Sequence, residues 1–152
     1  LVLPDYPTRY LLAIVSGSTD LGEITDACPS TTVTFHVGDP FYYGNKRRVE
    51  VKAGTFTVNA GGNRPAHLAI TANPSSSAAW YIRNVDTGEQ VKLASSVTST
   101  STVRVDMALE RATVNSQAAA VTLDSDFFTI NGRTTLQLSG GSAVLEWRER
   151  WL

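Results

Sequence analysis

The chain has 152 residues, of which 42% are hydrophobic and 18% are charged, a composition typical of one globular domain or of one domain with an additional piece. Its 13 basic and 14 acidic side chains nearly cancel, so the chain has no electrostatic reason to bind nucleic acid or an anionic membrane. The single cysteine, Cys28, excludes an internal disulfide, and the sequence shows neither a signal peptide nor an apolar stretch of membrane-spanning length. Thr, Ser, Val and Ala dominate, helix formers such as Lys, Glu and Met are sparse, and β-branched and small polar residues fit pleated, half-buried strands.

Two strands and a loop are predicted in the first 44 residues. The apolar run Tyr10–Val15 predicts a buried strand that is closed by the turn "SGSTD". The stretch "STTVTFHVGDP" alternates, which places Val33, Phe35 and Val37 on one face of a second strand. The following "GDPFYYGN" is punctuated by Gly and Pro and predicts a loop. We therefore place a domain boundary near Gly44. Residues 1–44 are the strands and linker that end an N-terminal domain, and residues 45–152 form a second domain.

Short strands at regular spacing are predicted in the second domain, and no window has a convincing helical period. The basic run "NKRR" at the start of this domain is interpreted as a solvated turn. The side chains expected to face the core are Val49, Val51, Phe56, Val58, Leu68, Ile70, Trp80, Ile82, Val91, Leu93, Val103, Val105, Met107, Ala112, Val114, Leu136, Leu138, Ala143, Leu145 and Trp147. About eight such strands separated by Gly, Asn or Asp predict an all-β fold, an antiparallel β-sandwich or barrel.

The sequence offers no pattern typical of catalysis, of a metal site or of a cofactor site. His36 and His67 have no His, Cys or Glu at metal-ligand spacing and are interpreted as surface histidines. In "LDSDFF", Asp124 and Asp126 match neither a calcium loop nor a paired-acid glycosidase, and are expected to bind backbone amides while one of the following phenylalanines enters the core. The one helix-like stretch, "NSQAAAVTLDSDFF", is short and is predicted to form at most one helical turn before an exposed loop. We expect no enzyme, no metal and no cofactor.

Four aromatic residues are the candidate contacts for a ligand or partner. In a β-sandwich that binds sugar, exposed Tyr or Trp rings stack on the ligand, and Tyr42, Tyr43 and Tyr81 are candidates for this role. Alternation along "AAWYIRN" sends Trp80 to the core and Tyr81 outward. The same residues are also explained as core and rim of a sandwich. The fourth candidate is Trp151, in a chain end, "EWRERWL", that is too aromatic for a frayed tail.

Three segments in order resemble one family, the distal tail proteins of long, flexible-tailed bacteriophages and prophages. They are "TVTFHVGDPFYYG", "YIRNVDTGEQVKL" and "LDSDFFTINGRTTLQLSGGSAVLEWRERWL". The positions that carry the resemblance are Thr32 to Phe35, Asp39, Pro40, Phe41, Tyr43, Ile82, Asn84, Thr87, Gly88, Glu89, Asp124, Ser125, Asp126, Phe127, Phe128, Gly132, Trp147, Arg148 and Trp151. After the Phe-Phe loop this chain has "NGRTTL", where the family often has Pro-Gly-x-Asn. The resemblance spans about residues 31 to 152.

The resemblance implies a fold, a role and partners. The second domain would be a galectin-like, jelly-roll sandwich, with Trp147 in its core and Trp151 over a sheet edge or a neighbouring subunit. The protein would be a structural virion protein at the tail tip, where a homo-hexameric ring joins the tail tube to tip or baseplate proteins. The family's first domain is longer than 44 residues, so the chain would carry only part of it. A carbohydrate-binding module that contacts the host cell wall is the alternative, and a wall-degrading enzyme is disfavoured.

Overall fold

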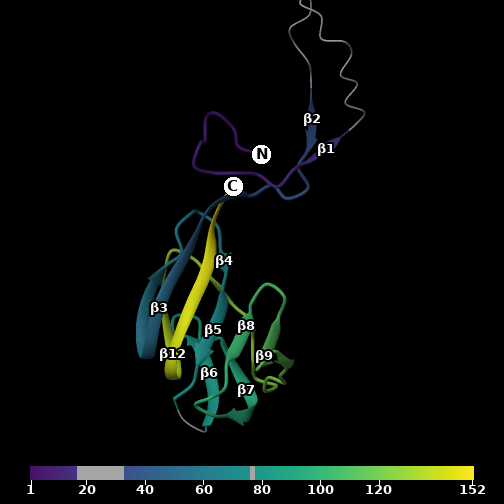
Figure 1. The fold of residues 1–152 in the computed structure, drawn as a ribbon. Coiled ribbons are helices and arrows are strands. Elements are labelled where there is room, and N and C mark those ends of the chain that lie inside the picture. Colours follow the sequence, from purple (N-terminus) through teal and green to yellow (C-terminus); the bar gives the residue numbers. More distant parts are fainter. Residues whose placement is uncertain (17–32, 76–77) are drawn as a thin grey trace, which may run out of the picture.

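The computed structural model describes residues 1–16, 33–75 and 78–152, and every regular element in these ranges is a strand (Figure 1). The strands are β1 (Ile14–Ser16), β2 (Thr34–His36), β3 (Tyr42–Asn59), β4 (Ala66–His67), β5 (Ala69–Asn73), β6 (Ala78–Asn84), β7 (Gln90–Val97), β8 (Val103–Asp106), β9 (Arg111–Val114), β10 (Gln117–Ala118), β11 (Thr129–Ile130) and β12 (Arg133–Trp151). All their named pairings are antiparallel. The predicted all-β antiparallel fold is therefore confirmed.

The last strand, β12, organises the sheet. One edge of β12 pairs with β3 from Arg133 to Trp151. Its other edge pairs with β6 through Leu136–Leu138 and with β5 through Ser142–Glu146. From β5 the sheet continues through β8, β9 and β10, and from β6 it continues to β7. The sheet thus curls around β12 and β3, and its two halves face each other across the core.

Glycines allow β3 and β12 to bend without ending. We predicted two strands in each of these regions, and the structure has one continuous strand in each. Gly54 (φ 115°) lies at the bend of β3 and Gly141 (φ 79°) at the bend of β12, where the β3–β12 register shifts between Leu138 and Ser142. A Cβ atom on Gly141 would lie 1.9 Å from the backbone oxygen of Asn73, so the corner admits only glycine.

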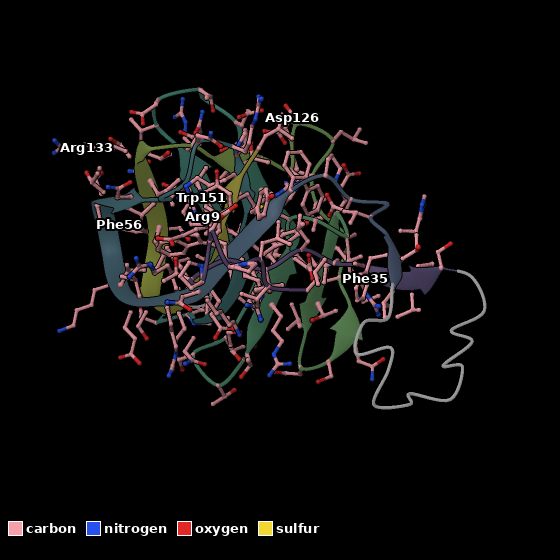
Figure 2. The ribbon with its side chains drawn as sticks, turned by 90° about the horizontal axis from the view of Figure 1, so that it is seen from above. Arg9, Phe35, Phe56, Asp126, Arg133 and Trp151 are labelled. Atoms are coloured by element: carbon pink, nitrogen blue, oxygen red, sulfur yellow. The ribbon has the colours of Figure 1, made fainter. Side chains whose placement is uncertain are left out.

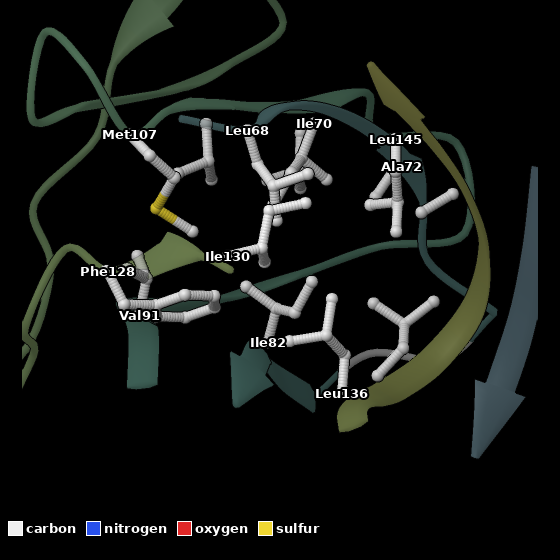
Figure 3. Close-up of a cluster of buried hydrophobic side chains, with 14 of the residues drawn as sticks. Leu68, Ile70, Ala72, Ile82, Val91, Met107, Phe128, Ile130, Leu136 and Leu145 are labelled. Carbon is white, nitrogen blue, oxygen red and sulfur yellow. The ribbon is translucent and has the colours of Figure 1, made fainter. Parts of the chain in front are cut away.

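The core fills the space between the two halves of the sheet (Figure 3). The predicted inward residues that are buried are Val58, Leu68, Ile70, Trp80, Ile82, Val91, Leu93, Val103, Val105, Met107, Ala112, Leu136, Leu138, Ala143, Leu145 and Trp147, and Val51, Phe56 and Val114 pack against them partly buried. Phe128 supplies the predicted aromatic side chain from the Phe-Phe loop. Val49, on β3, is an exception at 39% exposure. Alternation was a reliable guide to the core.

The prediction of a buried strand over Tyr10–Val15 is wrong. Only Ile14–Ser16 is a strand, and the side chains of Ile14 and Val15 are 68% and 52% exposed. In its partner β2, Phe35 is 42% exposed. β1 and β2 pair only with each other within the described ranges, so this two-stranded ribbon lacks a second layer that could bury an apolar face. The predicted turn after Val15 and Cys28 lie outside the described residues.

Three other local predictions are also wrong. The loop expected up to Gly44 ends earlier, because β3 begins at Tyr42, and the basic run that we expected in a turn lies within β3. Cross-strand pairing explains both, since Tyr42 and Tyr43 pair with the last residues of β12. The segment predicted to contain a helical turn forms β10 and then an extended stretch, in which Ala120 accepts a hydrogen bond from Ala94 of β7. No helix in the described parts of the chain is long and apolar enough to cross a membrane.

Candidate functional site

Aromatic and arginine side chains gather where residues 6–10 and 39–43 meet the end of the sandwich. Two of them, Arg9 and Trp151, are labelled next to each other in Figure 2. The gathered side chains come from three segments that are distant in sequence: the start of the chain, the entry into β3, and the end of β12. We call this group the junction cluster; it comprises Tyr6, Arg9, Tyr10, Asp39, Phe41, Tyr42, Tyr43, Arg148, Arg150 and Trp151. It includes three of the four residues predicted as partner contacts.

Backbone and ring contacts join the start of the chain to β3. The backbone N–H of Tyr10 donates to the Tyr43 oxygen at 2.9 Å, and the N–H of Tyr43 donates back to the Tyr10 oxygen at 2.8 Å. Their rings stack with centroids 5.8 Å apart. Four residues earlier in the chain, the ring of Tyr6 lies 5.3 Å from that of Tyr42. Contacts of this kind between aromatic rings stabilise a structure by about 0.5–1.5 kcal/mol beyond the area that they bury.

Arginine side chains then connect the start of the chain and β3 to the end of β12. The guanidinium of Arg9 lies 4.0 Å from the ring centroid of Trp151, and that of Arg150 lies 4.0 Å from the ring centroid of Phe41. The indole of Trp151 covers Gly44, where a Cβ atom would come within 2.6 Å of the ring. Cations so close to an aromatic face are attracted by its quadrupole, at about 0.5–2 kcal/mol per pair. The cluster therefore fixes how the first residues sit on the sandwich.

Asp39 caps the entry into β3. Its carboxylate accepts a hydrogen bond from the Tyr43 hydroxyl and another, at 3.2 Å, from the backbone N–H of Phe41. The Tyr43 hydroxyl is the main reason that the pKa of Asp39 lies below its ordinary value, and the positive charge of Arg150 adds to this effect. Burial and the neighbouring Asp39 raise the pKa of Tyr43. The pair therefore favours an ionised Asp39 and a protonated Tyr43.

Replacing Tyr43 with Phe should raise the pKa of Asp39. The lowered pKa in the native protein means that Asp39 contributes stability above its ordinary pKa of 3.8, and that this contribution is lost as the pH falls through the folded-state value. Without the Tyr43 hydroxyl, the largest cause of the shift is gone. A carboxyl NMR titration of both proteins measures the effect. An Asp39 midpoint that is identical in the two proteins would contradict the hydrogen bond.

Replacing Arg9 with Met should loosen the first residues without unfolding the sandwich. Losing its contact with Trp151 costs about 1 kcal/mol, which corresponds to a roughly fivefold increase in amide exchange from the opened state. We expect this increase in residues 3–11 and little change in the melting temperature. Arg83→Met is the matched control, since Arg83 is exposed on β6. Equal exchange in the two variants would show that Arg9 does not hold the segment.

The remaining predicted candidate, Tyr81, lies outside the junction cluster. It is on β6, where it pairs with Lys92 of β7 and its backbone N–H donates to the Ser139 hydroxyl at 2.9 Å. Tyr42 and Tyr43 are half-buried under Tyr6 and Tyr10. The three tyrosines are thus not combined into one exposed stacking surface.

The sequence prediction missed the arginines and the aromatic residues that complete the cluster. The residues not predicted as contacts are Tyr6, Arg9, Tyr10, Phe41, Arg148 and Arg150, together with Asp39. Of these, Asp39, Phe41 and Arg148 had been noted only as positions of the family resemblance. The alternation of aromatic and basic residues in both "YPTRY" and "WRERW" was the available signal. Nothing in the sequence pairs these two stretches, because the pairing requires β3 and β12 to be neighbours.

The residues considered for chemistry are separate from one another. His36 and His67 are both exposed, and the described ranges contain no group of three residues able to hold a metal ion. The Asp124 carboxylate accepts a hydrogen bond from the Gln90 side chain at 2.8 Å. The anchor of this loop is Ser125, which the sequence singled out only as a position of the family resemblance. Its hydroxyl accepts a hydrogen bond from the Lys92 N–H at 3.1 Å and donates one to the Lys92 carbonyl oxygen at 3.2 Å. These contacts hold a loop in place and assemble no reactive group.

The fold and the junction define a structural module, a β-sandwich clamped to the segment that precedes it. The family described as "Siphovirus-type tail component, C-terminal domain" matches residues 61–151, which is more than half of the chain. The chain therefore belongs to the siphovirus-type tail component family and is a structural protein of the virion tail.

A solved structure is similar in fold to nearly the whole chain. It is the crystal structure of SPP1 Dit (gp 19.1), described as a paradigm of the hub adsorption apparatus in phages that infect Gram-positive bacteria. The two structures superpose with a TM-score of 0.79 over 98% of this chain, at 20% sequence identity. The match covers 63% of the SPP1 chain, so this chain spans less than two thirds of it. No curated protein sequence matched.

Proposed function

We propose that the protein is a hub at the distal end of the tail tube, where it holds components of the tail tip or baseplate. The observation that carries this proposal is the similarity in fold, along 98% of the chain, to a protein described as the hub of an adsorption apparatus. The family match over residues 61–151 supports a role in the tail independently of that similarity. This role needs no cofactor and no catalysis.

The two domains would divide the work of the hub. We infer that residues 1–44 belong to the ring-forming domain and that residues 45–152 project from it as the sandwich. The core cluster supports this division, since its residues begin at Val58. The junction cluster would hold the two parts in a fixed orientation. Apolar side chains exposed before the sandwich support a subunit contact there: Leu12, Ile14, Val15, Val33 and Phe35.

Electron microscopy of labelled virions tests the location. Gold particles coupled to antibodies against residues 45–152 are expected at the junction of the tail tube and the tail tip. A two-dimensional average of the purified protein from the complete gene should show a ring. Labelling along the tube or at the head–tail connector would overturn the hub proposal.

The chain of 152 residues alone should be monomeric or weakly associated. It should enter a ring only when a complete first domain is present, and we expect that ring to be a hexamer. The β1–β2 ribbon offers an apolar contact, but two short strands form too small a surface for a stable ring. Multi-angle light scattering on both lengths of protein measures this. A stable ring formed by the short chain would show that the sandwich carries the assembly contacts.

No specific observation favours the carbohydrate-binding alternative. It requires an exposed platform of tyrosines, whereas Tyr42 and Tyr43 are engaged by other tyrosines of the chain and Tyr81 lies on another part of the sandwich. A wall polysaccharide array would still detect such binding.

Release of sugar or peptide from purified cell walls by the native protein, lost in a double Asp124→Ala, Asp126→Ala variant, would overturn the proposal that the protein is not an enzyme.

A further inference from the structure

The outer edge of β3 is open over a long stretch. One edge of β3 pairs with β12, and at its start Tyr43 pairs with Tyr10 on the other side. From Gly44 onward, no strand of the described ranges pairs with this second edge, and β3 lies at the margin of the sheet (Figure 1). Successive residues of a strand direct their N–H and C=O groups to opposite edges. Every second residue of β3 therefore presents unpaired backbone groups at this outer edge.

The open edge carries an excess of positive charge. Between Asn45 and Ala53 there are four basic side chains and one acid, Glu50, in a chain whose overall net charge is −1. The basic side chains are Lys46, Arg47, Arg48 and Lys52. Three of them form ion pairs within the chain: Lys46 with Glu146 at 2.9 Å, Arg47 with Glu149 at 2.8 Å, and Arg48 with Glu50 at 3.3 Å. The side chains of these three basic residues are still 52–61% exposed. Exposed pairs of this kind contribute only about 0–1 kcal/mol, so a carboxylate from another chain could replace the internal partner at little cost.

A hollow lies beside this edge, on the inner face of β3. It has a volume of about 430 Å³, and β3 lines it from both sides of its bend, with Val49 from the first half and Thr57 from the second. Trp147, which is 5% exposed, and the Arg47–Glu149 ion pair complete the wall. A strand added to the edge would direct alternate side chains into this hollow and toward the exposed basic residues.

These features together point to one kind of occupant. Backbone pairing at an edge gives affinity for any extended peptide, while pockets for alternate side chains select its sequence. Two copies of β3 paired edge to edge would bring Lys and Arg side chains against each other, which is unfavourable. We propose that the β3 edge binds an extended acidic segment of another protein, whose alternate residues are Asp or Glu over the basic row and small apolar side chains in the hollow.

This proposal rests on the proposed hub function in one respect only, which is the location of the partner protein. If the protein is a hub, then the segment belongs to a neighbouring tail protein. The edge can be tested with the purified chain, whereas the hub role is tested by its location in the virion. Failure of one test is therefore distinguishable from failure of the other.

Peptide binding tests the edge directly. The probe is a fluorescein-labelled peptide, Glu-Val-Glu-Val-Glu-Val-Glu, and the controls are the same peptide with Lys in place of Glu and the acidic peptide with every backbone amide methylated. When the protein is added, we expect the anisotropy to rise for the unmethylated acidic peptide and to stay unchanged for both control peptides. We also expect this peptide to slow amide exchange in residues 45–53. Binding of the methylated peptide with equal affinity would show attraction by charge without strand addition and would overturn the proposal.

Charge-reversal variants locate the site. Arg48→Glu with Lys52→Glu should weaken binding of the acidic peptide about tenfold, in line with the loss of two favourable charge contacts. Arg83→Glu with Arg111→Glu is the matched control, because it changes the net charge equally at exposed positions on β6 and β9. Equal weakening by both pairs, no binding to the native chain, or sedimentation as an edge-paired dimer would each overturn the proposal.

Discussion

Removal of residues 142–152 is expected to prevent the protein from folding into a soluble form. This segment pairs with β3 on one side and with β5 on the other, so its loss splits the sheet. It also removes Leu145 and Trp147 from the core. Losing a buried Trp side chain alone costs about 3–5 kcal/mol, which is a large part of the roughly 5–15 kcal/mol that stabilises a domain.

Near-ultraviolet circular dichroism and thermal unfolding measure this effect. Deletion of Leu152 alone is the control, since this residue is 59% exposed, and it should leave both signals close to native. Trp147→Ala gives a graded test in a chain of full length, because it also removes the buried hydrogen bond from the indole Nε1 to the Ala60 oxygen, at 2.8 Å. A truncated protein with a native melting temperature would show that β12 is not needed for the fold.

Gly141→Ala is expected to be among the most damaging glycine substitutions in the sandwich. The φ of 79° at this position is unfavourable for alanine, and the new Cβ atom would lie 1.9 Å from the Asn73 oxygen. Strain and displacement of the β5 end together should cost about 3 kcal/mol, or roughly 10 °C in melting temperature.

The neighbouring glycine is the matched control. A Cβ atom on Gly140 would meet only the Ser75 hydroxyl, at 3.4 Å, and its φ is not in the left-handed region. Gly140→Ala should therefore have little effect on the melting temperature. Equal effects of the two substitutions would mean that the bend of β12 tolerates a side chain at Gly141, contrary to the geometry of the corner.

Local alternation in the sequence was sufficient to predict the core and the fold class. Pairs such as Leu136 and Leu138 could be assigned to the buried face because a strand exposes alternate residues to opposite sides, whatever its partners. The continuity of β3 and β12 could not be predicted in this way. Gly54 and Gly141 look like turn residues in sequence, and only the pairing between the two strands shows that the chain bends there and continues.

The junction cluster was predicted in part for the same reason. Tyr42, Tyr43 and Trp151 were conspicuous as aromatic residues, but their neighbours depend on long-range contacts that a single sequence does not specify. Exposure of Ile14 and Phe35 was also unpredictable, because an alternating apolar strand indicates only that a face is suited to burial. Whether that face is covered depends on what packs against it.

The placement of Tyr42 opposite Trp151 has a mechanical consequence for a protein in a virus tail. These residues end the β3–β12 ladder, so the chain enters and leaves the sandwich at the same end. A force that pulls the first residues away from a held sandwich would peel β3 from β12 one pair at a time, instead of shearing many hydrogen bonds together. Arg9 on Trp151 and Tyr10 on Tyr43 anchor those first residues to both strands. The load is thus divided between β3 and β12 before any pair of the ladder opens.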